Sequence, residues 1–114
     1  MTQMAPKETL GILVPTNKHI DHLIGIAKAA KRAGKALCIF FTHEGVLTTQ
    51  DPRYRELASV VGENGMNRIS LCNASWEDHG LKDRPVPECM SPDDLATQSR
   101  HCALIDACDR YLVI

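Results

Sequence analysis

The chain has 114 residues, and its 13 basic and 14 acidic side chains leave a formal net charge of −1. This length suits a single domain with one hydrophobic core, so we expect residues 1–114 to form one domain. A net charge close to zero gives no basic field that would attract a nucleic-acid backbone or an anionic membrane surface. We therefore expect neither nucleic acid nor membrane as a partner.

The hydrophobic runs and the cysteine count indicate a cellular compartment. The longest apolar runs, such as Leu37 to Phe41, are far shorter than the roughly 20 residues of a membrane-spanning helix. Met1 to Glu8 carries no hydrophobic stretch, so we expect no signal peptide and a cytoplasmic location. Five cysteines are an odd number, which in such a chain favours reduced thiols over a disulfide framework.

The first part of the chain alternates between strand and helix patterns. Thr9 to Val14 is a continuous apolar run closed by Pro15, as expected of a strand buried on both faces. Apolar residues then recur at three- and four-residue steps, which predicts a helix over His19 to Ala33, stopped by Gly34. A second buried strand is predicted at Ala36 to Phe41. A helix between two such strands indicates a right-handed parallel βαβ crossover.

The pattern continues through the middle of the chain. Thr42 to Asp51 is predicted to be a loop, with a short strand at Val46-Leu47 as an option. Arg53 to Glu63 has helical spacing, and Asn67 to Cys72 is the third main strand predicted. Asn73 to Gly80 suggests a helix of about two turns that ends at a glycine.

The remaining elements complete the predicted fold. Lys82 to Met90 contains two prolines and should be an irregular loop. Ser91 followed by Pro92 is a typical helix start, and we expect this helix to run to about Cys108, with Leu95, Cys102, Ile105 and Ala103 facing inward. Arg110 to Ile114 should be a last strand. The fold class predicted is α/β, a three-layer α/β/α sandwich with a mostly parallel sheet of four to five strands.

Nucleotide and metal motifs are absent from the sequence. No G-x-G-x-x-G and no G-x-x-x-x-G-K-[ST] occurs, so we expect no dinucleotide or P-loop cofactor. No C-x-x-C or H-E-x-x-H occurs either, and we expect no metal. His19 and His22 have a spacing that could bind a metal, but an exposed helix edge is the favoured interpretation.

Polar residues follow the ends of the predicted parallel strands. In open α/β sheets, ligands bind beyond the carboxyl ends of the strands. His43 and Glu44 follow the second strand, Asn17 follows the first, and Asn73 follows the third. A ligand pocket at this edge would use Asn17, Glu44 and Asn73, with His43 as an accessory group.

Cys72 is the preferred candidate for chemistry. It ends a buried strand and directly precedes a predicted helix, whose first N–H groups have no partner within the helix and would favour a thiolate. His79 comes two helical turns later and could line the same pocket.

The other cysteines are assigned by their position in the predicted elements. Cys38, Cys102 and Cys108 fall within or beside buried elements and are expected to be packing residues. Cys89 lies in a proline-bounded loop, where we expect it to be exposed and able to act as a second, accessory thiol. An exposed loop cysteine without a role is an equal alternative.

Two segments, Ile69 to Leu81 and Leu104 to Ile114, resemble the DsrE/DsrF-like family. Ile69 to Leu81 is similar to its active-cysteine segment, in which a strand ends in cysteine and a short helix leads to Gly and an aliphatic residue. Leu104 to Ile114 is similar to the family's closing helix and strand, and Phe40-Phe41 before Gly45-Val46 is also in keeping. The resemblance implies a small α/β/α subunit in homotrimers or homohexamers, with Cys72 in the position of the cysteine that carries sulfane sulfur.

Three functions follow as hypotheses. The favoured one is a cytoplasmic sulfur carrier rather than a turnover enzyme, which takes sulfur on Cys72 as a persulfide from a donor protein and passes it to an acceptor protein. The second is an oligomeric small-molecule-binding or assembly module without covalent chemistry. The third is a redox protein in which Cys89 resolves oxidised Cys72, which requires their Cα atoms to approach within about 7 Å.

Overall fold

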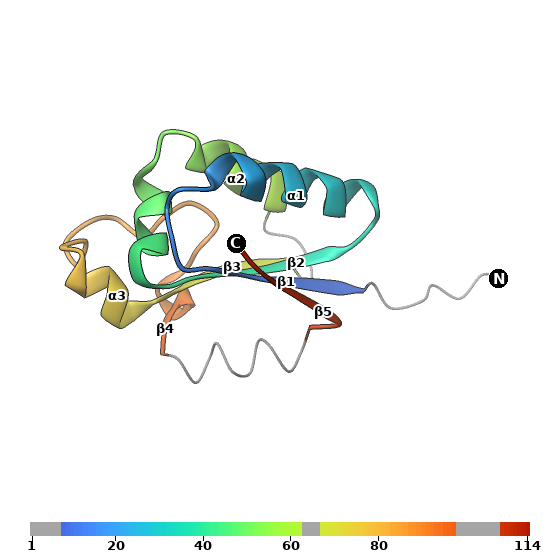
Figure 1. Ribbon diagram of the computed structural model, residues 1–114. Coiled ribbons are helices and arrows are strands. Elements are labelled where there is room, and N and C mark those ends of the chain that lie inside the picture. Colours follow the sequence, from blue (N-terminus) through green and yellow to red (C-terminus); the bar gives the residue numbers. More distant parts are fainter. Residues whose placement is uncertain (1–7, 63–66, 98–107) are drawn as a thin grey trace.

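The computed structural model describes residues 8–62, 67–97 and 108–114. Its elements, in chain order, are β1 (Thr9–Val14), α1 (Ile20–Arg32), β2 (Ala36–Phe41), the 3-10 helix η1 (His43–Gln50), α2 (Tyr54–Val61), β3 (Arg68–Cys72), α3 (Asn73–Asp78), the 3-10 helix η2 (Pro92–Asp94), β4 (Leu95–Ala96) and β5 (Arg110–Val113) (Figure 1).

The strands form one sheet in the order β4-β3-β2-β1-β5, and every neighbouring pair is parallel. β1 lies between β2 and β5, so that Gly11 is in register with Cys38 on one side and with Tyr111 on the other. Helices flank this five-stranded sheet, as in a three-layer α/β/α sandwich. The predicted fold class is confirmed.

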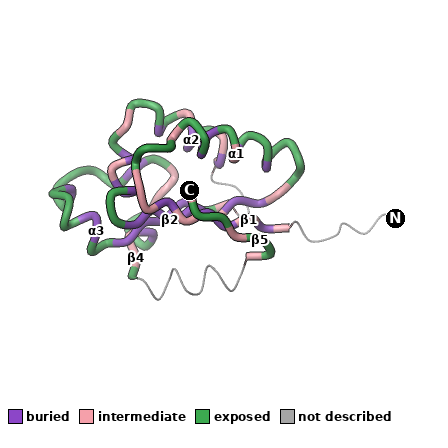
Figure 2. Tube along the Cα trace, in the orientation of Figure 1, coloured by how far each residue is buried: buried purple, intermediate pink, exposed green. Residues whose placement is uncertain are grey.

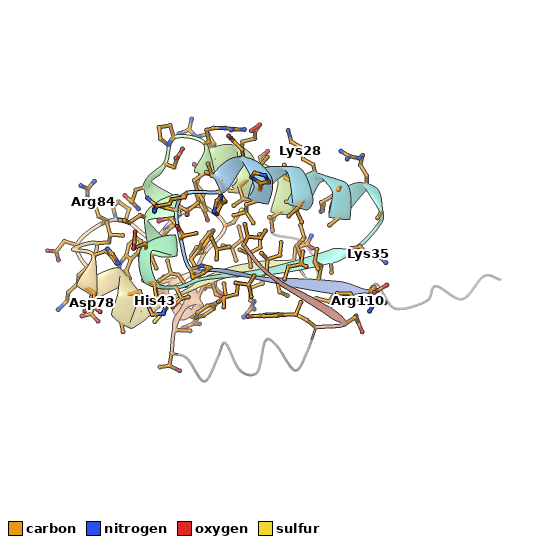
Figure 3. The ribbon with its side chains drawn as sticks, in the orientation of Figure 1. Lys28, Lys35, His43, Asp78, Arg84 and Arg110 are labelled. Atoms are coloured by element: carbon orange, nitrogen blue, oxygen red, sulfur yellow. The ribbon has the colours of Figure 1, made fainter. Side chains whose placement is uncertain are left out.

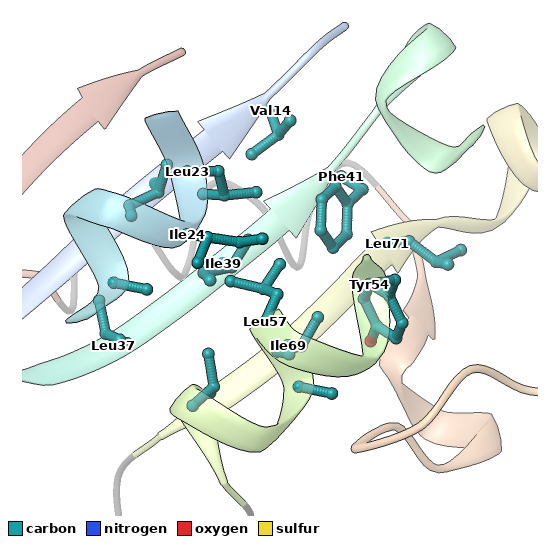
Figure 4. Close-up of a cluster of buried hydrophobic side chains, with 14 of the residues drawn as sticks. Val14, Leu23, Ile24, Leu37, Ile39, Phe41, Tyr54, Leu57, Ile69 and Leu71 are labelled. Carbon is teal, nitrogen blue, oxygen red and sulfur yellow. The ribbon is translucent and has the colours of Figure 1, made fainter. Parts of the chain in front are cut away.

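The main core lies between the sheet and the helices α1 and α2, which cover the same face of the sheet (Figure 1). Ile12, Ile39 and Ile69 point from three neighbouring strands into this core and are fully buried. Leu23 from α1 and Leu57 from α2 lie in the same cluster, beside Ile39 and Ile69 in the close-up of Figure 4. Each such side chain contributes about 1.5–3 kcal/mol by leaving water, which makes this the principal stabilising interface of the fold.

A smaller cluster occupies the opposite face of the sheet. Phe40 and Cys72 are buried there, and Leu13, Cys38 and Cys108 pack against them. The central strands are therefore buried on both faces, whereas the outer surface of α1 is exposed (Figure 2). Burial on both faces explains why the strands read as unbroken apolar runs rather than as alternating patterns.

The predicted bounds of the first two strands agree with the structure residue for residue. The helix predicted between them is α1, and Gly34 has a φ of +75° just after its end, a conformation that favours glycine. The helices predicted after Asp51 and after Cys72 are α2 and α3. The last strand, β5, also lies where the sequence predicts it.

The optional strand at Val46-Leu47 is wrong, because these residues belong to η1. The N–H of Gly45 donates to the Thr42 carbonyl at 2.8 Å, which closes the first turn of that helix. Val46 is fully buried without belonging to the sheet. A short apolar pair can thus be buried by a helical turn as well as by a strand.

The helix expected to begin at Ser91 is also wrong in its length. The predicted cap is present, since the Ser91 N–H donates to the Asp94 carboxylate at 2.8 Å and closes a capping box. The helix nevertheless ends after one 3-10 turn. Leu95, predicted to face inward from a helix, pairs with Leu71 as part of β4. The rest of the predicted helix, with the inward residues Cys102, Ala103 and Ile105, lies outside the described residues.

Candidate functional site

The carboxyl ends of β1, β2 and β3 meet at one edge of the sheet, where η1 and α3 pack together. The His43 N–H donates to the buried Ser75 hydroxyl of α3 at 2.9 Å. His43 has a φ of +49°, which is unusual for a residue other than glycine, and its side chain is exposed beside α3 (Figure 3). This hydrogen bond attaches the segment after β2 to the helix that follows Cys72.

Cys72 is the last residue of β3 and the N-cap of α3. Its side chain is 4% exposed and packs with Phe40 in the smaller core cluster. The structure therefore places Cys72 at a strand-to-helix junction, as the sequence predicts. Because Cys72 is buried, a donor can reach its sulfur only when the residues around it move.

His79 does not lie beside Cys72. The two residues cap opposite ends of α3, so seven residues of helical rise, about 10 Å, separate their backbones. The first helical residue, Asn73, instead donates to the Glu77 carboxylate at 3.1 Å. An accessory role for His79 toward the thiol of the same subunit has no support in this geometry.

Cys89 belongs to the other face of the sheet. It is half-buried rather than exposed, and its thiol donates to the Ala58 carbonyl of α2 at 3.3 Å. It packs against the main core, whereas Cys72 belongs to the smaller cluster. The structure therefore does not bring these two cysteines together.

The three residues expected to line a ligand pocket, Asn17, Glu44 and Asn73, are exposed and follow the ends of three different strands. They lie at the predicted edge, but none of them lines the two cavities described next. Their role in binding stays a prediction.

One polar cavity has a volume of about 400 Å³. It lies between the end of η1, the start of α2 and the loop before η2, and it is lined by Thr49, Asp51, Pro52, Tyr54, Arg55 and Glu88. The Tyr54 hydroxyl donates to the Glu88 carbonyl at 2.7 Å, and burial raises the pKa of this tyrosine. Sequence reasoning missed this cavity, since its residues come from segments more than 30 positions apart.

A second cavity, of about 300 Å³, is apolar and lies where the strands begin. Leu10, Ile26 and Ala29 contribute to its walls, between β1 and α1. Glu8 is at its rim and forms ion pairs with Lys35 at 2.7 Å and Arg110 at 3.3 Å. This cavity opens at the end of the sheet opposite to Cys72.

Metal ligands do not gather in the part of the chain that the structure describes: no group of three or more His, Cys, Asp or Glu side chains could hold an ion there. The rings of His19 and His22 meet edge to face with centroids 5.9 Å apart. Cys38 and Cys108 pack against the smaller core cluster, as predicted. Cys102 lies outside the described residues.

A scan against protein-family models and a search of the curated proteins both found no match. Within the described ranges, no helix has the length and apolar character that spanning a membrane requires.

Proposed function

We propose that this protein is a sulfur carrier of the DsrE/DsrF-like kind, with Cys72 as the residue that holds the sulfur. The observation that carries the proposal is the position of Cys72 at the junction of β3 and α3, on the ligand-binding edge of a parallel sheet. The resemblance of Ile69 to Leu81 to the family's active-cysteine segment supports the same residue. A cytoplasmic location, where thiols stay reduced, would suit this role.

The transfer needs no cofactor. The Cys72 thiolate attacks the outer sulfur of a donor protein's persulfide, and the donor's S–S bond breaks as its thiolate leaves. Cys72 then carries the sulfur as a persulfide. An acceptor thiolate attacks that outer sulfur in turn, which releases the Cys72 thiolate. Each step exchanges one S–S bond for another and consumes no oxidant.

Burial of Cys72 sets a requirement on this mechanism. The hydrogen bond from His43 to Ser75 holds η1 against α3, the helix that Cys72 caps, so we expect opening of this contact to loosen the junction. We expect Ser75→Ala, which removes the acceptor of this bond, to speed loading of Cys72. Slower loading in Ser75→Ala would argue against the opening step.

The carrier function is tested by incubating the protein with polysulfide and measuring the gain of a sulfur atom at each cysteine by peptide mass spectrometry. We expect loading at Cys72, and its loss in Cys72→Ser. The matched control is Cys89→Ser, because Cys89 is a half-buried thiol on the other face of the sheet and serine can keep its hydrogen bond to the Ala58 carbonyl. Equal loading of Cys72→Ser and the unsubstituted protein would overturn the proposal.

A second candidate function, assembly without covalent chemistry, rests on the edge strand β5. Leu112 is 40% exposed and Val113 is 61% exposed, and β5 has a neighbour on one side only within the described sheet. Open edges pair readily with another chain. Two copies joined through β5 about a two-fold axis would be compatible with the hexamer that the resemblance implies.

This assembly is tested by light scattering of the purified chain. We expect Val113→Lys to shift the mass toward the monomer, since a charged residue on an edge strand opposes pairing. A monomeric unsubstituted protein would overturn the assembly function but leave the carrier function standing.

A further inference from the structure

Two thiols from distant parts of the sequence meet on the smaller-cluster face of the sheet. Cys38 is the third residue of β2, and Cys108 lies two residues before β5. β1 runs between them, with Gly11 in register with Cys38. A Cβ atom at Gly11 would lie 2.6 Å from the Cys108 sulfur, so this sulfur occupies space that only glycine leaves open.

Because the Cys108 sulfur lies next to Gly11, it also lies beside Cys38. Residues in register on neighbouring strands are about 4.8 Å apart, and the Cys38 side chain leaves the sheet on the same face as the absent side chain of Gly11. The two thiols are close enough that each contributes to the shift in the pKa of the other. Both side chains are half-buried and pack against the cluster of Phe40 and Cys72.

We infer that Cys38 and Cys108 form an oxidative modification site, at which a hydroperoxide converts the two thiols into a disulfide. This bond would tie the start of β5 to β2 across β1. It joins two residues that are 70 positions apart in the sequence and fastens the edge strand to the centre of the sheet.

The reaction balances in two steps. The Cys108 thiolate attacks the peroxide, whose O–O bond breaks to give a sulfenic acid on Cys108 and an alcohol, or water from hydrogen peroxide. The Cys38 sulfur then attacks the sulfenic sulfur, the S–S bond forms, and the hydroxyl leaves as water. The two thiols lose two electrons and two protons in total, and one hydroperoxide is reduced.

The geometry assigns the required movement to Cys108. A disulfide needs a sulfur separation of about 2.05 Å and Cα atoms within about 7 Å. Cys38 is held by strand pairing with β1 and β3 on its two sides, whereas Cys108 precedes an edge strand. We therefore expect Cys108 and Asp109 to shift toward β2 when the bond forms.

The environment makes this site slow to react and slow to revert. Burial raises the pKa of Cys38, and burial together with the neighbouring Cys38 and Asp109 raises the pKa of Cys108 to about 11. The reactive thiolate is scarce at neutral pH, so oxidation should accelerate about tenfold per pH unit below that value. Because both thiolates are poorly stabilised, the disulfide between Cys38 and Cys108 is a weak oxidant. This site therefore differs from a sulfur carrier, which must pass its sulfur on to an acceptor.

The test is oxidation of the full chain with hydrogen peroxide, followed by alkylation and peptide mapping under non-reducing conditions. We expect a Cys38–Cys108 disulfide that forms faster at higher pH. In Gly11→Ala both thiols remain, but the new methyl group displaces the Cys108 sulfur, and we expect the yield of this disulfide to fall about tenfold or more. Cys89→Ser is the control and should form the disulfide normally.

A second variant keeps the test decisive if Gly11→Ala folds poorly. Cys38→Ser removes the resolving thiol, so a sulfenic acid on Cys108 should persist and react with a dimedone probe, which should label the unsubstituted protein weakly. A disulfide that joins Cys108 to another cysteine, or equal disulfide yields in a folded Gly11→Ala protein, would overturn the inference. Neither result depends on whether Cys72 carries sulfur.

Discussion

The backbone of Gly45 lies directly against the carbonyl oxygen of Val14, so that a Cβ atom at position 45 would overlap with that oxygen. This contact sets the first turn of η1 on the end of β1, at the edge where Cys72 lies. We expect Gly45→Ala to lower the free energy of unfolding by about 1–3 kcal/mol or more, because backbone must move to admit the methyl group. Urea denaturation followed by circular dichroism measures the loss.

Gly25 provides the opposite case within the same protein. It is exposed in the middle of α1, and a Cβ atom there would meet no other atom within 4 Å. Gly25→Ala should therefore stabilise the protein by about 0.5–1 kcal/mol, since alanine loses less conformational freedom in a helix. If Gly45→Ala stabilised the protein, as Gly25→Ala is expected to, the contact between Gly45 and Val14 would not be what excludes a side chain at position 45.

Trp76 anchors α3 to the core. It is the one tryptophan of the chain and is 2% exposed in a helix of six residues. Trp76→Ala should cost about 3–5 kcal/mol, and Trp76→Phe less, because phenylalanine keeps part of the buried volume. Thermal melts of the two variants would measure this order. Equal melting temperatures for Trp76→Ala and the unsubstituted protein would show that α3 does not depend on this anchor.

Alkaline conditions should destabilise the fold through Cys108. Folding raises the pKa of this thiol from its ordinary value of 9.0 to about 11, so the folded chain holds the proton more tightly than the unfolded chain. The stabilisation is complete below pH 9 and is lost as the pH rises through about 11. Denaturation midpoints measured across this range should fall more steeply for the unsubstituted protein than for Cys108→Ala. Parallel curves for the two proteins would contradict the assignment.

Acid should weaken the ion pairs that Glu8 forms where β1, β2 and β5 begin. The hydrogen bond and charge of Lys35, and then Arg110, hold the pKa of Glu8 below its ordinary value of 4.5. Figure 3 shows the labelled Lys35 and Arg110 at the same end of the sheet. The stabilisation is present above pH 4.5 and is lost as the pH falls through the lower, folded value. Glu8→Gln should shift the acid unfolding transition slightly toward neutral conditions, and added salt should reduce the difference.

β1 and β2 could be predicted because the sequence of each strand carries its own evidence. β1 and β2 are buried on both faces, so their apolar runs end where the burial ends, at Pro15 and after Phe41. The length of the predicted helix after Ser91 could not be found in the same way. A capping box specifies where a helix starts, whereas its continuation was decided by strand pairing of Leu95 with Leu71, far away in sequence.

The candidate site was predictable in its position but not in its surroundings. The change of pattern after Cys72 is a local signal for a strand that leads into a helix. The separation of Cys89 from Cys72 depends on which face of the sheet each side chain occupies, and no local pattern near Cys89 reports this. One signal for the thiol pair was present in the sequence, since glycine inside an apolar strand, as at Gly11, often marks a close approach by another group.

The position of β5 beside β1 also shapes how the sheet is completed. Leu10 finds its partner on β2, Leu37, 27 positions later, but its partner on β5, Arg110, only 100 positions later. During synthesis β1 can therefore pair on one side early, while its other side stays open until Arg110–Val113 has left the ribosome. Contacts this distant in sequence slow folding, and an open β1 edge in the nascent chain is a site for aggregation. By pairing with β1, β5 thus protects that edge of β1 from pairing with other chains.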